Sequence, residues 1–142
     1  MATSNAATTY LENKLLSLIF KNNAGSFSSP GNSIYVGLAT AVADAEAGSL
    51  TEATFGNYAR QQVTAANWTI ASSSADQQTI KNAANIEFPA STGTTNTVTH
   101  AFIVDAASSG NILFIGALDA SKTIATGDIF RINTNNLTIE LK

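Results

Sequence analysis

The side chains that could carry acid–base or metal chemistry are one histidine and ten carboxylates, because the sequence contains no cysteine. A catalytic triad or a histidine-containing metal site would have to be built around His100. In an extended strand over residues 97–105, alternation places this ring on one face with Val98, Phe102 and Val104. We therefore expect a packed, structural histidine. The sequence also lacks the G-x-S-x-G, H-E-x-x-H and phosphate-loop motifs, so we expect no enzymatic activity.

The acidic residues show one local cluster, in which Asp44 and Glu46 are followed by Glu52. Carboxylates gathered in a loop are the ligands that Ca²⁺ prefers, but this spacing matches no EF-hand loop. A glycosidase would need two carboxylates held across a cleft, and nothing in their distribution favours such a pair. We therefore expect no metal ion and no cofactor.

Four aromatic side chains allow a different hypothesis, a carbohydrate-binding β-sandwich module. Aromatic rings can stack on sugars, although in β proteins they more often form the core. The four candidates for such a patch are Tyr35, Phe55, Tyr58 and Trp68.

Charge and hydropathy exclude two classes of partner. The formal net charge is −3, and the seven lysine and arginine residues are scattered along the chain, whereas nucleic-acid binders cluster theirs. The apolar runs are too short to span a bilayer, and residues 1–9 lack the layout of a signal peptide. We expect neither nucleic acid nor membrane as a partner. Charged residues form only 12% of the chain, a composition that suits a surface packed in an assembly.

Residues 8–21 have the pattern of an amphipathic helix. Thr9 and Glu12 match a capping box, and Lys21 complements the dipole at the other end. The apolar positions follow the spacing of a single helix face that is unusually wide. Two interpretations stay open: the helix covers one end of a β core, or it docks on a neighbouring subunit. The candidate docking face consists of Leu11, Leu15, Leu16, Leu18, Ile19 and Phe20.

After Pro30 the pattern changes to short β segments separated by turn residues. We predict strands over 33–40, 57–65, 68–71, 79–88, 97–105, 112–118, 129–132 and 137–142. This spacing is typical of an antiparallel β-sandwich or jelly-roll-like domain. The chain is then mainly β with one N-terminal α-helix, a single domain over 1–142 with a helical segment at 1–25 and the sandwich at 30–142.

The two longest predicted loops, near 41–56 and 89–97, are the natural places for contacts with other molecules. The candidate contact residues in and beside them are Asp44, Glu46, Glu52, Phe55, Thr92 and Asn96.

Six segments occur in an order that resembles a family of small virion structural proteins of tailed phages, including marine and cyanobacterial ones. Members are described as head-decoration, tail-fibre-like or minor tail proteins. The segments are YLENKLL (10–16), IYVGLAT (34–40), GNYARQ (56–61), VTHAFIVDA (98–106), GNILFIG (110–116) and KTIATGD (122–128).

This resemblance implies a non-enzymatic protein of a bacteriophage virion, synthesised in the cytoplasm of the host bacterium. It implies a capsid decoration (cement) protein that forms a homo-oligomer, such as a trimer, and binds the particle surface. The alternative is a tail-associated protein, a fibre, adaptor or tail tip that contacts the host receptor. Its partners would be other copies of itself and phage capsid or tail proteins, with a host-surface glycan as a further candidate.

Overall fold

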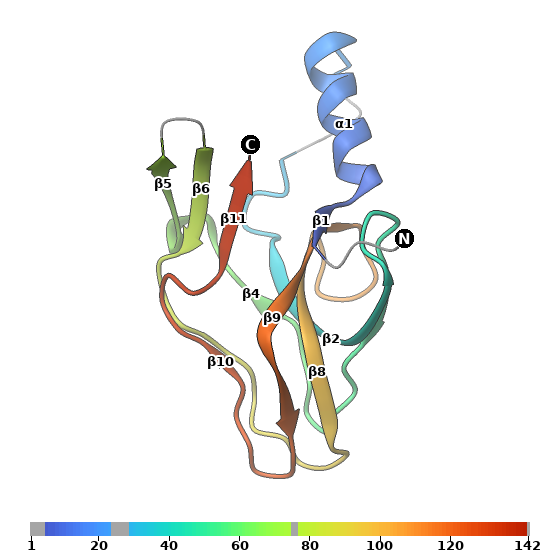
Figure 1. Cartoon of the computed structure of the whole chain (residues 1–142), viewed down its shortest axis with the longest axis vertical. Helices are drawn as coiled ribbons and strands as arrows, with labels where there is room; N and C mark the ends of the chain where they lie inside the picture. Colours follow the sequence, from blue (N-terminus) through green and yellow to red (C-terminus); the bar gives the residue numbers. More distant parts are fainter. Residues whose placement is uncertain (1–4, 24–28, 75–76, 142) are drawn as a thin grey trace.

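The computed structural model describes residues 5–23, 29–74 and 77–141, and the chain in these ranges is mainly β-strand with a helix near its N-terminus (Figure 1). The elements, in chain order, are β1 (Ala6–Ala7), α1 (Thr9–Phe20), β2 (Tyr35–Asp44), β3 (Ser49–Glu52), β4 (Gln61–Gln62), the 3₁₀ turn η2 (Ala65–Asn67), β5 (Trp68–Ser74), β6 (Gln77–Asn82), β7 (Ile86–Glu87), β8 (Asn96–Val104), β9 (Ile112–Ile124), β10 (Arg131–Ile132) and β11 (Thr138–Leu141).

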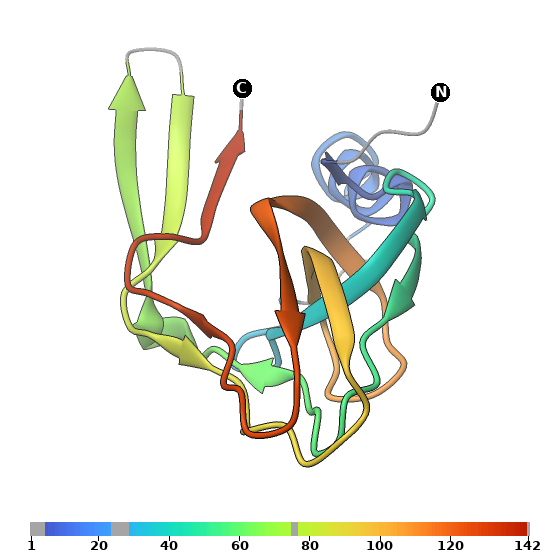
Figure 2. The same cartoon turned by 60° about the horizontal axis from the view of Figure 1, so that its bottom comes forward.

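The strands form three antiparallel sheets that curl around a shared interior. The largest has the order β1-β9-β8-β2-β3, with β4 also pairing with β2. A second sheet has the order β11-β6-β5, and β10 pairs with β7. Figure 2 shows the large sheet curling toward the β7–β10 and β5–β6–β11 strands, which gives a half-barrel, sandwich-like arrangement. The predicted fold class, antiparallel and mainly β with one N-terminal helix, is confirmed.

A bulge in β9 produces much of this curl. Val98 of β8 is opposite Lys122 of β9, and His100 is opposite Ala117. Between these two pairs β8 has the single residue Thr99, whereas β9 has the four residues 118–121. Extra residues on one strand bend it and increase its twist. The bend turns Val98 into a different hydrophobic cluster from Phe102. The expectation that Val98 shares a face with His100 and Phe102 is therefore wrong, because the bulge interrupts the alternation.

Three apolar clusters hold the sheets together. The first joins the large sheet to the β7–β10 side and includes Val36, Leu38, Phe55 and Phe88, each at most 2% exposed. A chain of ring contacts runs through it, from Phe55 to Tyr58, Phe88 and Phe130. The second packs Phe102, Val104 and Ile115 on the other face of the sheet, and the third surrounds Leu11, Ile103 and Leu113. Burying each large apolar side chain contributes about 1.5–3 kcal/mol.

Several predicted strand boundaries are corrected. The predicted loop after residue 40 is mostly the β2–β3 hairpin, because β2 continues to Asp44 through small residues that fit the pleat. Of the predicted strand 57–65, only Gln61–Gln62 pairs. The predicted loop 72–78 is largely occupied by β5 and β6, and the predicted strand 112–118 extends to Ile124.

The predicted strand 79–88 is broken in two by Asn82. This side chain is fully buried, and its amide donates to the carbonyls of Ala84 (2.8 Å) and Asn133 (3.0 Å). Its Oδ1 accepts from the Leu137 amide at 2.9 Å. These bonds satisfy the polar atoms of the buried Asn82 side chain. They also tie the end of β6 to the segment between β10 and β11, and a strand that continued past Asn82 would not allow this connection.

The residue that caps the start of α1 is Thr8 rather than Thr9. The Thr8 hydroxyl accepts from the Leu11 amide (3.4 Å) and donates to the Ile112 carbonyl (2.6 Å). The Thr8 amide donates to Leu113 O, and the Thr9 amide donates to Glu46 O. The predicted Thr9–Glu12 capping box is therefore wrong by one position. The cap residue is the one that can bond to β9 and to the helix at once.

Gly37 of β2 lies directly under the ring of Phe102 in β8, its register partner. A methyl group at this position would collide with three carbon atoms of that ring. The close approach lets a buried phenylalanine cover the sheet without a gap, which is the packing density expected of a protein interior.

Gly37→Ala should therefore destabilise the fold by about 2 kcal/mol, because overpacking forces a buried ring to move. The measurement is urea unfolding of the purified protein. Gly93→Ala is the matched control, since nothing lies within 4 Å of the added methyl group, and it should change stability by less than about 0.5 kcal/mol. In a Phe102→Leu background the cost of Gly37→Ala should shrink. Equal costs in both backgrounds would contradict this account of the contact.

Candidate functional site

The apolar face of α1 is divided between the body of the protein and solvent. Leu11 is only 6% exposed and belongs to the third cluster, where Leu15 packs against it. Leu16, Ile19 and Phe20 are 55%, 67% and 78% exposed. We call these three side chains the α1 tip. The predicted docking face is corrected at Leu11, which is buried, whereas Leu15 and Leu18 are half-buried.

The α1 tip is held at the end of a well-terminated helix. The Lys21 and Asn23 amides both donate to the Ser17 carbonyl, and Asn22 adopts a left-handed backbone with φ of 48°. This arrangement closes the last turn and satisfies carbonyls that would otherwise lack a partner. Figure 1 shows this end of α1 projecting away from the sheets. The tip is therefore an exposed apolar feature at a regularly capped helix end.

A cleft of about 970 Å³ lies between β9 and the β10–β11 segment. Figure 2 shows these two segments facing one another. The β9 wall is open to solvent, because residues 119–123 are all exposed. At one end, the Asn5 side chain accepts a hydrogen bond from the Ala117 amide at 2.6 Å. We call this feature the β9–β11 cleft. The large apolar side chains that line it include Ile103, Phe114, Leu118, Phe130, Leu137 and Ile139.

The two predicted contact loops meet at Gly56, whose amide donates to the Gly93 carbonyl and whose carbonyl accepts from the Thr92 amide. Asp44 Oδ1 accepts from the Glu46 and Ala47 amides and closes the β2–β3 turn, in which the Glu46 side chain is exposed. Thr92 is exposed, and Asn96 Oδ1 accepts from the Thr54 amide at 2.6 Å. The remaining two candidates, Glu52 and Phe55, have structural roles.

Phe55 is wrong as a contact residue because it is 2% exposed and packs in the first cluster. Its ring meets Tyr58 edge to face at 5.2 Å between centroids. An aromatic residue in a predicted loop can either contact a partner or pack in the core. Phe55 packs in the core, where the burial of its large ring stabilises the fold.

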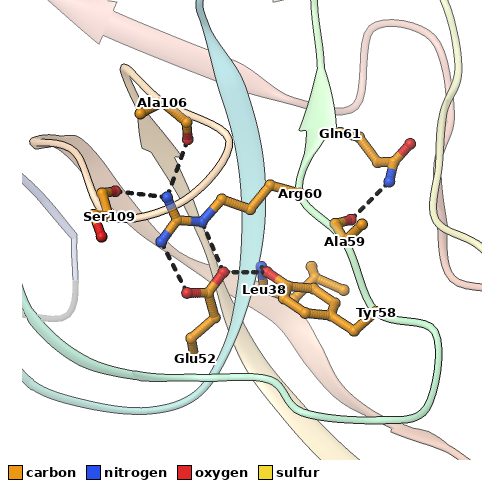
Figure 3. A network of polar contacts seen from close by, with 8 residues as sticks. All are labelled: Leu38, Glu52, Tyr58, Ala59, Arg60, Gln61, Ala106 and Ser109. Atoms are coloured by element: carbon orange, nitrogen blue, oxygen red, sulfur yellow. Dashed lines mark hydrogen bonds and ion pairs between the residues drawn. The ribbon is translucent and has the colours of Figure 1, made fainter.

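Glu52 is the centre of a polar network beside β2 and β3 (Figure 3). Arg60 binds its carboxylate in a bidentate manner, with both N···O distances at 2.8 Å. Arg60 Nη1 also donates to the carbonyls of Ala106 (3.0 Å) and Ser109 (2.7 Å). The Tyr58 hydroxyl donates to Glu52 Oε1 (2.8 Å) and accepts from the Leu38 amide (3.0 Å). The network thus ties the strands to the 105–111 turn.

The network also covers part of the large sheet, because the Arg60 guanidinium lies 5.3 Å from the centre of the Phe102 ring. Burial by itself would raise the pKa of Glu52, but hydrogen bonds from Arg60 and Tyr58 and the charge of Arg60 bring that pKa below its ordinary value. The bond to Glu52 raises the pKa of Arg60, and burial together with Glu52 raises the pKa of Tyr58. Glu52 therefore stays ionised in the folded protein and is not a free ligand.

Among the described residues, no acidic side chain bonds to His100 and would make it a base. Its Nδ1 lies 2.8 Å from the Thr99 hydroxyl, and burial lowers its pKa, so the ring is neutral at pH 7. Its Nε2 is buried without a hydrogen-bond partner. Within residues 5–23, 29–74 and 77–141, no three histidine or carboxylate side chains gather as metal ligands.

The four aromatic candidates for a sugar patch all pack against the hydrophobic clusters of the core. Phe55 and Tyr58 belong to the first cluster, and Tyr35 packs against the second. Trp68 contacts the first and third clusters, and its indole N–H donates to the Val63 carbonyl at 3.3 Å. This packing gives no support to a sugar-binding patch.

A family model matches nearly the whole chain. Residues 6–140 match the family model described as "Podophage GP4 fiber I protein gp80". No curated protein matches the chain. Among the helices in the described ranges, none has the length and apolar composition needed to cross a bilayer.

Glu52→Gln should lower the free energy of unfolding by about 1–2 kcal/mol near pH 7, because the bidentate, charge-assisted pair is lost. The pKa of Glu52 is lower in the folded than in the unfolded chain. The contribution of Glu52 to the free energy of unfolding is therefore complete above its pKa in the unfolded chain, near 4.5. That contribution is lost as the pH falls through the pKa of Glu52 in the folded protein. Urea unfolding of wild type and variant across this range tests the prediction, and the two curves should converge at acidic pH.

Glu87→Gln is the control for this measurement. Its ion pair with Arg131 has side chains that are 46% and 50% exposed, so its loss should cost less than about 0.5 kcal/mol. If the two substitutions cost the same at neutral pH, the Glu52 network does not have the structural role assigned to it.

Proposed function

Since the chain belongs to the family of podophage GP4 fiber I proteins, we propose that it is a structural component of the tail fibre of a podophage. The observation that carries the proposal is the extent of the match. It runs over residues 6–140 and so includes the N-terminal helix, the bulged strand β9 and the cleft beside it.

We favour a tail location over the capsid decoration role that the resemblance implied. The description of the family names a fibre protein. A fibre is one of the tail-associated proteins that the resemblance gave as the alternative to capsid decoration. The fold itself is compatible with both the head and the tail, because a β domain with exposed apolar side chains can bind other proteins at either place. The family description is what favours the tail.

We also propose that the role is structural rather than catalytic. The groups that could do chemistry are used inside the fold: Glu52 binds Arg60, Asp44 closes a turn, and the His100 ring bonds to Thr99. None of these arrangements pairs a nucleophile with a base across an open pocket, as covalent catalysis requires. The proposal includes synthesis in the host cytoplasm and folding of the chain as one domain.

The α1 tip is the surface through which we propose that the protein assembles. Each of its three side chains could contribute up to about 1.5–3 kcal/mol if a partner buried it fully. Exposed aromatic and aliphatic side chains that cluster in this way mark interaction sites. A host-surface glycan gains no comparable support, because the four aromatic candidates pack against the core.

Gold-labelled antibodies against the chain, applied to purified particles of the phage that encodes it, should mark the tail in electron micrographs. A particle built without the protein supplies the control for antibody specificity. Label distributed over the head would contradict the tail assignment and support capsid decoration.

Leu16→Ser, Ile19→Ser and Phe20→Ser combined in one chain should reduce incorporation into the virion at least tenfold, while far-UV circular dichroism and urea unfolding change little, because the three side chains are exposed. Quantitative immunoblotting of purified particles measures incorporation. Ile70→Ser is the control, since Ile70 is 73% exposed and lies outside α1. Normal incorporation of the triple variant would overturn the assembly role of the tip.

A further inference from the structure

We infer that His100 is an acid-sensitive latch beside the bulge in β9. When the neutral ring takes up a second N–H proton, it leaves its place in the sheet, and the pairing of β8 with β9 loosens there. The inference goes beyond the proposed function and does not depend on where the protein lies in a virion. It rests on the hydrogen bonds of the ring, on its position beside the bulge and on its small neighbours.

The neutral ring of His100 fits its site, whereas the charged ring does not. Nδ1 lies 2.8 Å from the Thr99 hydroxyl, which can either donate to this nitrogen or accept from it. Of the side-chain nitrogen and oxygen atoms in the described part of the chain, Nε2 of His100 is the one that is buried without a hydrogen-bond partner. A charged imidazole carries an N–H on both nitrogens. Protonation in place therefore leaves a buried donor without an acceptor, which costs the desolvation of that group.

The charges around His100 do not offset this cost. The titratable side chains on the strands beside β8 and next to them are Tyr35 and Asp44 of β2, Asp119 and Lys122 of β9, and Glu52 of β3 with its partner Arg60. The two in β9 have opposite signs and are exposed. The Glu52 carboxylate is already bound by Arg60 and by the Tyr58 hydroxyl. Burial is the cause that lowers the pKa of His100.

The ring is also connected to the bulge. Thr99 is the single β8 residue opposite residues 118–121, and its hydroxyl is bonded to Nδ1 of His100. The same hydroxyl donates to the Ala39 carbonyl of β2 at 3.5 Å. A ring that leaves its site therefore frees the residue that faces the bulge. Because residues 118–121 have no partners of their own in β8, this part of the sheet has fewer pairings to break than the rest.

Small neighbours give the charged ring a path to solvent. His100 is opposite Ala39 in β2 and opposite Ala117 in β9. Ala117 is exposed and His100 is half-buried, so the ring lies close to water although its Nε2 is covered. A change of side-chain rotamer can therefore hydrate the ring without displacing a large neighbour on either strand.

The sign of the pH effect follows from the lowered pKa of His100. In the unfolded chain this pKa is near the ordinary value of 6.5, and in the folded protein it is lower. As the pH falls below 6.5, the unfolded chain takes up a proton before the folded chain does, so stability falls. His100 is the only histidine in the sequence. No other side chain with an ordinary pKa titrates between pH 5.5 and 7.5, which makes this window specific for His100.

Proton NMR of the single imidazole tests the inference on the unaltered protein. The ring protons of His100 should titrate at a lower pH in the folded protein than in the same chain unfolded in concentrated urea. A pKa in the folded protein that equals or exceeds the pKa in urea would overturn the inference.

Urea unfolding at pH 7.5 and at pH 5.5 measures the coupling to folding. The equilibrium constant for unfolding of the wild type should be about three- to fivefold larger at pH 5.5. His100→Gln keeps a polar side chain that gains no proton, so its constant should be the same at both pH values. Thr95→Gln is the matched control, since it adds the same side chain at an exposed position and keeps the histidine. It should behave as the wild type, and an equal pH effect in His100→Gln would overturn the inference.

Hydrogen–deuterium exchange locates the change along the chain. Wild type and His100→Gln are compared at the same pH, which cancels the effect of pH on the intrinsic exchange rate. The ratio of the wild-type rate to the variant rate should rise about threefold from pH 7.5 to pH 5.5 in peptides that cover 96–102 and 115–123. The ratio should stay constant in peptides from β6. A uniform rise along the chain, or a rise confined to other regions, would overturn the placement of the latch beside the bulge.

Discussion

Strand β9 is the element on which the rest of the structure depends. It pairs with β8 along most of its length, pairs with β1, and receives the start of α1 through the Thr8 hydroxyl and the Thr8 amide. Its bulge at 118–121 curls the large sheet and turns Val98 and Ile124 into the first hydrophobic cluster. Without this bend, the β7–β10 side and the large sheet could not share one interior.

The same bend leaves an open cleft, and the helix anchored on β9 has an exposed apolar end; neither feature stabilises the fold. The outer part of the β9 wall remains open, and the cleft beside it separates β9 from the β10–β11 segment. The helix that β9 anchors buries Leu11 at its start but leaves Phe20 in solvent at its end. A surface with few charges and an apolar projection is poorly suited to an isolated protein and well suited to one that is covered by neighbours. This contrast connects the fold to a role in a virion.

The sequence predicts the fold class and the helix well because both follow from local patterns. The spacing of Leu11, Leu15 and Leu18 predicts a helix without any information about the surface against which the helix packs. The bulge in β9, in contrast, arises from register between two distant strands and has no local signal. For the same reason the sequence cannot show which end of the helix face is buried, or that Phe55 is core whereas Glu52 is bonded to Arg60. The cleft is lined by segments more than 100 residues apart, such as Ala6 and Ile139, and it appears only when the chain is folded.

Hydrogen–deuterium exchange, followed by mass spectrometry at low and high protein concentration, tests the central claim most directly. The claim is that the end of α1 is covered when the protein assembles in the virion. Exchange should slow on assembly in peptides that contain residues 16–21, while peptides from the centre of β8, already protected in the monomer, should not change. Unchanged exchange in residues 16–21 at concentrations where larger species are present, or protection confined to other surfaces such as β5, would contradict the account.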